Sequence, residues 1–226
     1  MCVNFTAQPP SRGSTDMLQT ERAERPTPSV TIHRLSVAQY DAMGRAGILS
    51  PDDRVELLEG WLVEKMTKNP PHRIATRQTR LALEAVVPDS LYVETQEPIV
   101  TDDSEPEPDV AVIRGRTQDY EGRSPPASQV GLVVEIADTT VERDRLLKAR
   151  VYARARIPAY WLVNLAENQV EVYADPQGED PQGEGATPHY ATRTDVHEGD
   201  VPVILDNVEV GRVSVHLLLG LGTSRP

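Results

Sequence analysis

Two carboxylates and a lysine lie between residues 108 and 148 at positions where they could bind a metal ion. Asp109 stands at the head of the apolar run 110–113, Glu135 lies inside the run 131–136, and Lys148 lies in the basic segment that follows. Both runs are short, rich in Val and Ile, and bounded by Pro or Gly, so we predict two buried strands. A carboxylate in a buried strand is costly unless something compensates its charge. The trio therefore suggests a metal site.

The chemistry that suits this trio is hydrolysis of a phosphodiester. Mg²⁺ prefers oxygen ligands and usually takes only one or two protein carboxylates. Held between Asp109 and Glu135, Mg²⁺, or Mn²⁺ in its place, would polarise the phosphodiester and lower the pKa of a bound water. Lys148 would orient that water or stabilise charge on the phosphoryl oxygens. Side chains alternate across a strand, so Glu135 is expected to share a face with Val133 and Ala137.

A purely structural interpretation of each residue stays open. Asp109 could simply cap or end a strand, and Glu135 could form an ion pair with Lys148, because Glu is rarely buried without a partner. Asp144 lies four residues before Lys148. On an exposed helix that spacing supports a salt bridge of about 0.2–0.5 kcal/mol. The metal hypothesis requires the helix face with Lys148 to lie against the part of the sheet with Asp109 and Glu135.

Three further residues could contact the catalytic trio from outside: Glu56, Asp144 and His72. Glu56 could add a carboxylate, or belong to the polar alternation of an exposed hairpin. His72 could contact phosphate or donate a proton, or be an exposed histidine without a role. The other histidines (His33, His189, His197 and His216) show no spacing typical of zinc ligands. The sequence contains no Gly-rich phosphate loop and no Gly-x-Ser-x-Gly motif, so no further cofactor is expected.

The first half of the chain provides elements that could support the site. Residues 36–39 have the form of a capping box, which predicts a helix to about Arg45. Strands are predicted over residues 54–58 and 61–66 around the Glu59-Gly60 turn, and over residues 91–95 and 98–100. An amphipathic helix is predicted over residues 73–87, with Ile74, Leu81 and Ala85 facing inward. Residues 114–129 are expected to form a polar loop.

The second half adds the lysine helix and more strands. Residues 139–142 resemble a capping box, which places the start of that helix. Strands are predicted over residues 159–165 and 169–174 and at Tyr190, and residues 201–205 and 213–219 are expected to supply strand or helical-turn segments. The tandem copies at 175–179 and 180–184 predict a flexible loop over residues 175–188. This alternation favours an α/β fold with a mixed β-sheet flanked by helices.

Composition indicates one globular domain, residues 30–221, after a disordered tail, residues 1–29, that is rich in Pro, Ser and Thr. No apolar stretch approaches the roughly 20 residues that a membrane span needs, and no signal peptide is evident. The single cysteine, Cys2, is typical of a reducing compartment. We therefore expect a cytoplasmic protein without a membrane partner. The oligomeric state, a homodimer included, is left open.

The charge is uneven along the chain. The formal net charge of −12 argues against non-specific coating of nucleic acid, which depends on basic surface. Residues 164–209 hold eleven acidic residues and one arginine, whereas residues 141–156 hold six basic and two acidic residues. Residues 71–82 contain Arg73, Arg77 and Arg80 and no acid. The two basic helices could form a local phosphate-facing surface, or be solvated helix faces.

Several motifs in order resemble the PD-(D/E)xK pattern of restriction-endonuclease-like folds, and more closely the Uma-type restriction endonuclease family. They are Arg54-Val55-Glu56-Leu57-Leu58-Glu59-Gly60, Glu105-Pro106-Glu107-Pro108-Asp109, Leu132-Val133-Val134-Glu135-Ile136-Ala137-Asp138, Lys148, Tyr152-Ala153-Arg154-Ala155 and Ile157-Pro158-Ala159-Tyr160-Trp161. The resemblance covers residues 35–219. It implies a restriction-endonuclease-like fold with an N-terminal helix and β-hairpin, a Mg²⁺-dependent endonuclease and DNA as substrate. On this pattern the catalytic residues are Asp109, Glu135 and Lys148, and the metal ligands are Asp109 and Glu135.

The sequence departs from the pattern at three positions. The usual lysine position, two residues after the glutamate, holds Ala137, so the resemblance implies a lysine moved to the next helix, Lys148. Trp61 and Asn164 stand where acidic residues would be usual. Two other hypotheses follow: a catalytically inactive protein of the same fold that binds nucleic acid or a partner protein, and a hydrolase for a smaller phosphoester.

Overall fold

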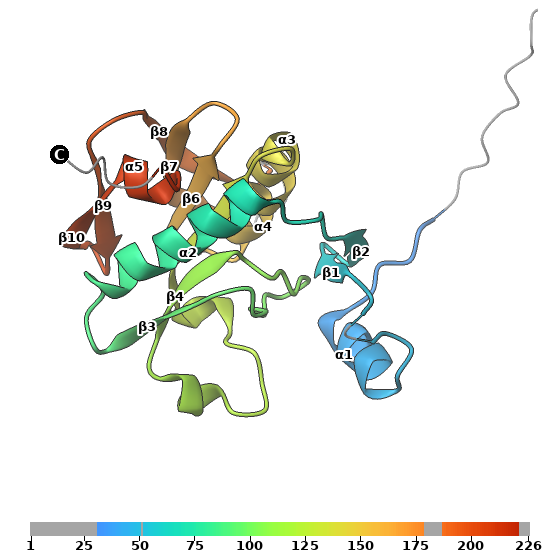
Figure 1. Ribbon diagram of the computed structural model, residues 1–226. Helices are drawn as coiled ribbons and strands as arrows, with labels where there is room; N and C mark the ends of the chain where they lie inside the picture. Colours follow the sequence, from blue (N-terminus) through green and yellow to red (C-terminus); the bar gives the residue numbers. More distant parts are fainter. Residues whose placement is uncertain (1–30, 51, 179–186, 222–226) are drawn as a thin grey trace, which may run out of the picture. The chain divides into compact units, whose positions relative to one another are not determined.

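A six-stranded mixed sheet, in the order β3-β4-β5-β6-β7-β8, forms the centre of the fold (Figure 1). The computed structural model describes residues 31–50, 52–178 and 187–221. The sheet strands are β3 (Leu91–Glu94), β4 (Val110–Arg114), β5 (Val130–Ala137), β6 (Ala159–Asn164), β7 (Gln169–Gln177) and β8 (His189–Val196). Neighbouring strands are antiparallel except β5 and β6, which are parallel. Two separate hairpins are β1 (Val55–Leu58) with β2 (Trp61–Glu64), and β9 (Asp200–Leu205) with β10 (Val208–Ser214).

Helices cover both faces of the sheet. The helices are α1 (Val37–Arg45), α2 (Pro70–Glu84), α3 (Val141–Arg143), α4 (Ala149–Arg154) and α5 (Val215–Leu218), with 3₁₀ turns at Thr117–Tyr120 and Ala127–Gln129 and a π-helical turn at Asp144–Lys148. On one face Val134 and Ile136 of β5 pack in a cluster with residues of α2, α5, β9 and β10. On the other face Val133 and Ala137 pack with α4. Because both faces are covered, every residue of β5 is buried. The predicted strand parity of Glu135 is confirmed.

The first predicted helix is confirmed, and the second begins earlier than predicted. The Ser36 side chain accepts from the Gln39 N–H and the Gln39 side chain from the Ser36 N–H, which completes the predicted capping box of α1. Helix α2 begins at Pro70, after Asn69, whose side chain accepts a hydrogen bond from the His72 N–H. An Asn followed by Pro at the first helical position is a start signal.

The predicted inward face of α2 is wrong. Ile74 and Leu81 are about half exposed and Ala85 is exposed, whereas Ala75, Thr76, Thr79 and Leu83 are buried. A Cβ at Gly220, after α5, would lie 3.2 Å from the Ala75 backbone nitrogen. The buried face is thus lined mainly by small residues, because α2 packs closely against the C-terminal segment. Size and hydrophobicity alone pointed to the wrong face.

The segment after β5 differs from the capping-box prediction. Thr140 precedes α3 without a side-chain cap, and its hydroxyl instead donates to Asp144 Oδ2 at 2.5 Å. After α3, residues Asp144–Lys148 form the π-helical turn, in which Asp144 and Lys148 are both buried. Single π turns within helices are rare and are often found at functional sites.

Two predicted flexible segments lie partly or wholly outside the described residues. The predicted tail, residues 1–29, lies outside them, as do residues 179–186 of the predicted loop 175–188. The start of that loop is strand, not loop, because Pro176 pairs with Tyr190 and Gln177 with His189 across β7 and β8. Among the described residues no helix is long and apolar enough to cross a membrane.

Candidate active site

Asp109 immediately precedes β4, where the chain enters the middle of the sheet. The register pairs Val110 of β4 with Val134 of β5, so Asp109 lies next to the strand that carries Glu135. Its Oδ2 accepts the Ile136 N–H at 3.0 Å and lies 3.0 Å from His72 Nε2, and its Oδ1 lies 3.3 Å from Lys68 Nζ. Burial alone would raise the pKa of Asp109, but His72, Lys68 and the Ile136 N–H outweigh it and hold that pKa below its usual value.

Glu135 is buried inside β5 and receives two side-chain hydrogen bonds on one oxygen. Lys148 Nζ donates to its Oε1 at 2.8 Å, and the Tyr152 hydroxyl donates to the same atom at 2.5 Å. Burial raises the pKa of Glu135 to about 8, an effect that Lys148 opposes and Asp109 reinforces. Burial is thus the main cause of the raised pKa, and the neighbouring acids add to it.

Lys148 is 3% exposed and joins Glu135 to the N-terminal hairpin. Its Nζ lies 2.8 Å from Glu135 Oε1 and 3.1 Å from Oε2 of Glu56, a residue of β1. Glu56 Oε2 also accepts the backbone N–H of Glu107 at 3.1 Å. Burial alone would lower the pKa of Lys148, but Glu135, Glu56 and Asp144 hold it above its usual value. Lys148 therefore keeps its proton at neutral pH.

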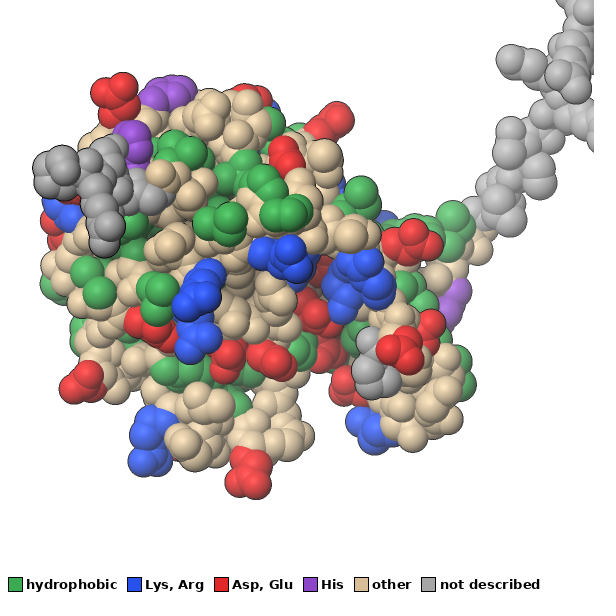
Figure 2. Space-filling model, viewed as in Figure 1, with side chains coloured by type: hydrophobic (Ala, Val, Ile, Leu, Met, Phe, Trp, Pro, Cys, Tyr) green, Lys and Arg blue, Asp and Glu red, His purple; other side chains and the backbone are tan. Residues whose placement is uncertain are grey.

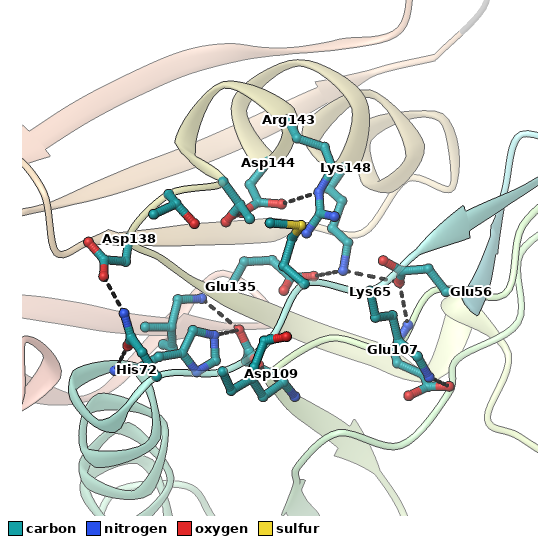
Figure 3. Close-up of a pocket in the computed structure, with 17 residues that line it drawn as sticks. Glu56, Lys65, His72, Glu107, Asp109, Glu135, Asp138, Arg143, Asp144 and Lys148 are labelled. Carbon is teal, nitrogen blue, oxygen red and sulfur yellow. Dashed lines mark hydrogen bonds and ion pairs between the residues drawn. The ribbon is translucent and has the colours of Figure 1, made fainter. Parts of the chain in front are cut away.

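The trio lines one cavity, which Figure 3 shows between α2, the π-helical turn and β1. The cavity volume is about 60 Å³, more than the roughly 10–15 Å³ that one water needs. Its acidic lining residues are Glu56, Glu107, Asp109, Glu135, Asp138 and Asp144, and its basic ones are Lys65, Lys68, Arg143 and Lys148, with His72 beside them. Among the described residues Lys148 is the one buried lysine or arginine, whereas Glu56, Asp109, Glu135 and Asp144 are all buried.

The three candidates for outer contacts all line this cavity. The interpretation of Glu56 as part of an exposed hairpin is wrong, because Glu56 is 1% exposed and bonded to Lys148. His72 contacts Asp109, and its Nδ1 lies 3.3 Å from the Thr76 hydroxyl. Asp144 accepts from Thr140 and pairs with Arg143 at 3.4 Å, and burial raises its pKa. The structure thus gives Asp144 these partners, and Lys148 pairs with Glu135 and Glu56 instead.

Two residues in contact with the site were missed by the sequence analysis. Tyr152 bonds Glu135, and its place four residues after Lys148 on the same helical face was the available signal. Lys68 contacts Asp109 from the segment before α2, and no local pattern marks it. Both contacts depend on how distant segments come together in the fold.

A further buried carboxylate, Glu171 of β7, connects the sheet to the lysine helix. It is fully buried and bonded to Arg145 by Nε at 2.9 and 3.0 Å, to the Tyr173 hydroxyl at 2.7 Å and to Asn164 Nδ2 at 2.9 Å. Asn164 is one of the departures from the family pattern. A neutral amide donates to Glu171 there, where an acidic side chain would repel it.

Basic residues of the helix after β5 form ion pairs with acidic side chains of the protein itself. Arg143 pairs with Asp144, Arg145 with Glu167 and Glu171, Arg150 with Glu59, and Arg154 with Glu59 and Asp103. Each partner is an acid in the same domain. This helix is therefore not the free phosphate-facing surface that its net charge suggested.

The donor set of the cavity fits a hard divalent cation. All acidic groups in it supply oxygen, as Mg²⁺ and Mn²⁺ prefer, and the pKa of Glu135 is raised first by burial and then by the neighbouring acids, whose charge a cation would offset. Among the described residues, no three His, Cys, Asp or Glu side chains are close enough to form a metal cage. Mg²⁺ usually takes one or two carboxylates, so the pair Asp109 and Glu135 suits it.

The mixed sheet, with Asp109 at the head of β4, Glu135 within β5 and Lys148 gathered at one cavity, is the arrangement expected of a restriction-endonuclease-like fold. The model of the Uma2 family, described as "Putative restriction endonuclease", matches residues 37–201, well over half of the chain. The chain therefore belongs to the Uma2 family.

A solved structure supports the fold assignment. The chain resembles the crystal structure of "a putative nuclease belonging to DUF820" from Anabaena variabilis, with a TM-score of 0.55 and 16% sequence identity. The match covers 82% of this chain and 97% of that one. At this identity the likeness shows the fold alone. No curated protein matches the sequence.

Proposed function

We propose that this protein is an endonuclease that hydrolyses phosphodiester bonds in DNA, with Mg²⁺, or Mn²⁺ in its place, bound by Asp109 and Glu135. One observation supports this proposal most: the buried carboxylates of Asp109, just before β4, and Glu135, within the adjacent β5, line a cavity together with Lys148, and acids outnumber buried cations there. Membership of a nuclease family is consistent with it.

In this proposal Glu135, Tyr152 and Lys148 have different roles. A bound Mg²⁺ would polarise the phosphodiester and lower the pKa of a water. The Tyr152 hydroxyl and Lys148 Nζ hold Glu135 through Oε1, and among the described residues no donor reaches Oε2, so that oxygen is left for a ligand. Lys148 keeps its proton, so it acts as a fixed positive charge that stabilises the phosphoryl oxygens and not as a general base.

His72 and Lys68 have a different role on the other side of the cavity. Both contact Asp109, and both carry donors that a phosphate oxygen could accept from. They hold Asp109 ionised, which a metal ligand must be. If Asp109 held a cation, the Lys68 ammonium and the His72 ring could donate to the phosphate of the substrate.

The experiment is a cleavage assay on plasmid and single-stranded DNA with Mg²⁺ or Mn²⁺, with a chelator as the control. We expect metal-dependent cleavage by the wild-type protein and none by Lys148→Ala, which should still bind the metal. Glu135→Ala should bind the metal less tightly, because it removes a ligand. Equal cleavage by wild type and Lys148→Ala would contradict the role given to this lysine.

One observation favours a second candidate, a catalytically inactive protein of this fold that binds nucleic acid or a partner protein. Both candidate ligands already pair with lysines: Asp109 contacts Lys68, with His72 beside it, and Glu135 contacts Lys148. In that case the trio is a structural ion-pair network. Absence of cleavage with every metal, together with no measurable metal binding, would favour this candidate.

A further inference from the structure

A second groove lies beside the candidate active site along α2. It has a volume of about 260 Å³ and is lined by Lys68, Arg73, Thr76, Arg77 and Arg80 on one side and by Thr95 and Gln96 on the other. All of these side chains carry hydrogen-bond donors, and none is acidic. Figure 2 shows basic side chains gathered on this face of a protein whose net charge is −12.

The charges of this groove are not neutralised in the way that those of the lysine helix are. Arg73 and Arg77 are exposed and form no ion pair among the described residues. Arg80, farther along the helix, pairs with Glu84 at 2.8 Å. Two adjacent arginines are therefore left with their charge directed to solvent.

The fold places these arginines in a line that leads to the cavity. Arg73 and Arg77 lie one turn apart on α2, ~6 Å along its axis, on the side away from the buried face of Ala75 and Thr79. Lys68 lines both the groove and the active-site cavity and lies 3.3 Å from Asp109. The Gln96 N–H donates to the Pro108 carbonyl at 3.0 Å, which fixes the opposite wall to the segment that carries Asp109.

We propose that this groove binds the phosphate backbone of the nucleic-acid strand whose phosphodiester enters the active-site cavity, with Arg73 and Arg77 each contacting a phosphate. This inference names the substrate-binding surface of the proposed nuclease and rests on that function only for the reaction. Arginine forks suit phosphate oxygens, and such contacts position a strand without reading its sequence.

Charge elsewhere on the protein supports this placement of the strand. Residues 164–209 carry a large excess of acids, and the basic residues of the helix after β5 hold internal partners. A phosphate backbone is therefore repelled by much of the surface and attracted along α2. The protein would bind DNA through few contacts, so its affinity should be modest and strongly dependent on salt.

The test is DNA binding measured without cleavage, by fluorescence anisotropy of a labelled oligonucleotide in chelator, over a range of salt. The oligonucleotide is used as a single strand and as a duplex, and the variants are Arg73→Ala/Arg77→Ala and a control, Arg116→Ala/Arg212→Ala. The control removes two exposed arginines outside the groove that pair with Asp119 and Glu209. Ala is favourable in a helix, so the groove variant should fold, which its melting temperature checks.

We expect the groove variant to bind about tenfold more weakly at low salt and the control to bind as wild type does. The slope of log affinity against log salt should fall by about 1.4 for the single strand, two contacts at about 0.7 each. Equal binding by the groove variant and wild type, equal losses in both double variants, or no DNA binding by wild type at low salt would each overturn the proposal. Asp109→Asn separates the two proposals: it should abolish cleavage, and because it removes the acid that pairs with Lys68 of the groove, DNA binding should be at least as tight as that of wild type.

Discussion

Replacing Lys148 by Met removes the buried cation of the site and keeps a side chain of similar length. In the native protein Nζ contacts Glu135 at 2.8 Å and Glu56 at 3.1 Å, and all three residues are nearly fully buried. Removing one partner of a buried ion pair costs about 3–5 kcal/mol, because it leaves an uncompensated charge. We therefore expect Lys148→Met to lower the free energy of unfolding by about 3–5 kcal/mol above pH 8, where Glu135 is ionised in the wild type.

The cost should depend on pH with a defined sign. The pKa of Glu135 is about 8 in the folded protein, above the 4.5 that is usual for a glutamate. A carboxyl whose pKa rises on folding contributes stability below pH 4.5, and this stability is lost as the pH rises toward 8. Lys148 opposes the rise, so its removal raises the pKa of Glu135 further. The cost of Lys148→Met should therefore increase as the pH rises above 8, where Glu135 is ionised in the wild type but still protonated in the variant.

The assay is urea unfolding of the wild type and Lys148→Met at pH values below and above 8, in chelator and with Mg²⁺. Glu135→Gln in the Lys148→Met background should restore part of the loss, because it removes the charge that the lysine compensated. If the site binds the metal, Mg²⁺ at 100 times its Kd should add about 2.7 kcal/mol. A cost that is below about 1 kcal/mol, or that is independent of pH, would refute the reasoning.

Three further predictions concern single residues. Glu171→Gln should cost about 1.5–3 kcal/mol at neutral pH, measured by urea unfolding. Burial alone would raise the pKa of Glu171, but its hydrogen-bond donors hold that pKa at about 2. The stability that Glu171 contributes is therefore present above pH 4.5 and is lost as the pH falls toward 2. Tyr152→Phe should cost about 1 kcal/mol in the same assay and slow any cleavage, because Glu135 loses a donor. Mg²⁺ affinity, measured by calorimetry, should rise as the pH passes through 8, because Glu135 must lose its proton to bind a cation; an affinity that is constant with pH would contradict this.

The alternation of side chains along short apolar runs predicted much of the fold and the centre of the site. The alternation around Glu135 gave the correct face, and the adjacency of the Asp109 and Glu135 strands follows from two buried runs joined by one loop. The lysine on the following helix lies beside Glu135, as the family resemblance implied, and its helix belongs to the connection between the parallel strands β5 and β6. These features depend on residues close in sequence.

Features that depend on distant contacts were not predictable in the same way. Ile74 is more apolar than Ala75, yet Ala75 is buried, because α2 lies close to the C-terminal segment around Gly220. The burial of Glu56 depends on Lys148, which lies more than ninety residues later. The π-helical turn has no simple sequence signature either. Its position reflects how Asp144 and Lys148 are buried together.

The hairpin β1–β2 has a consequence for the dynamics of the site. It forms a two-stranded sheet outside the central one, and an isolated hairpin is marginally stable in water. Ion pairs link it to the helix after β5, through Glu56 with Lys148 and through Glu59 with Arg150 and Arg154. It is therefore expected to open as a local unit before the sheet does, with faster amide hydrogen exchange than β5. Each opening would uncover one wall of the candidate active-site cavity. The same motion would then admit substrate and expose the hairpin amides to exchange.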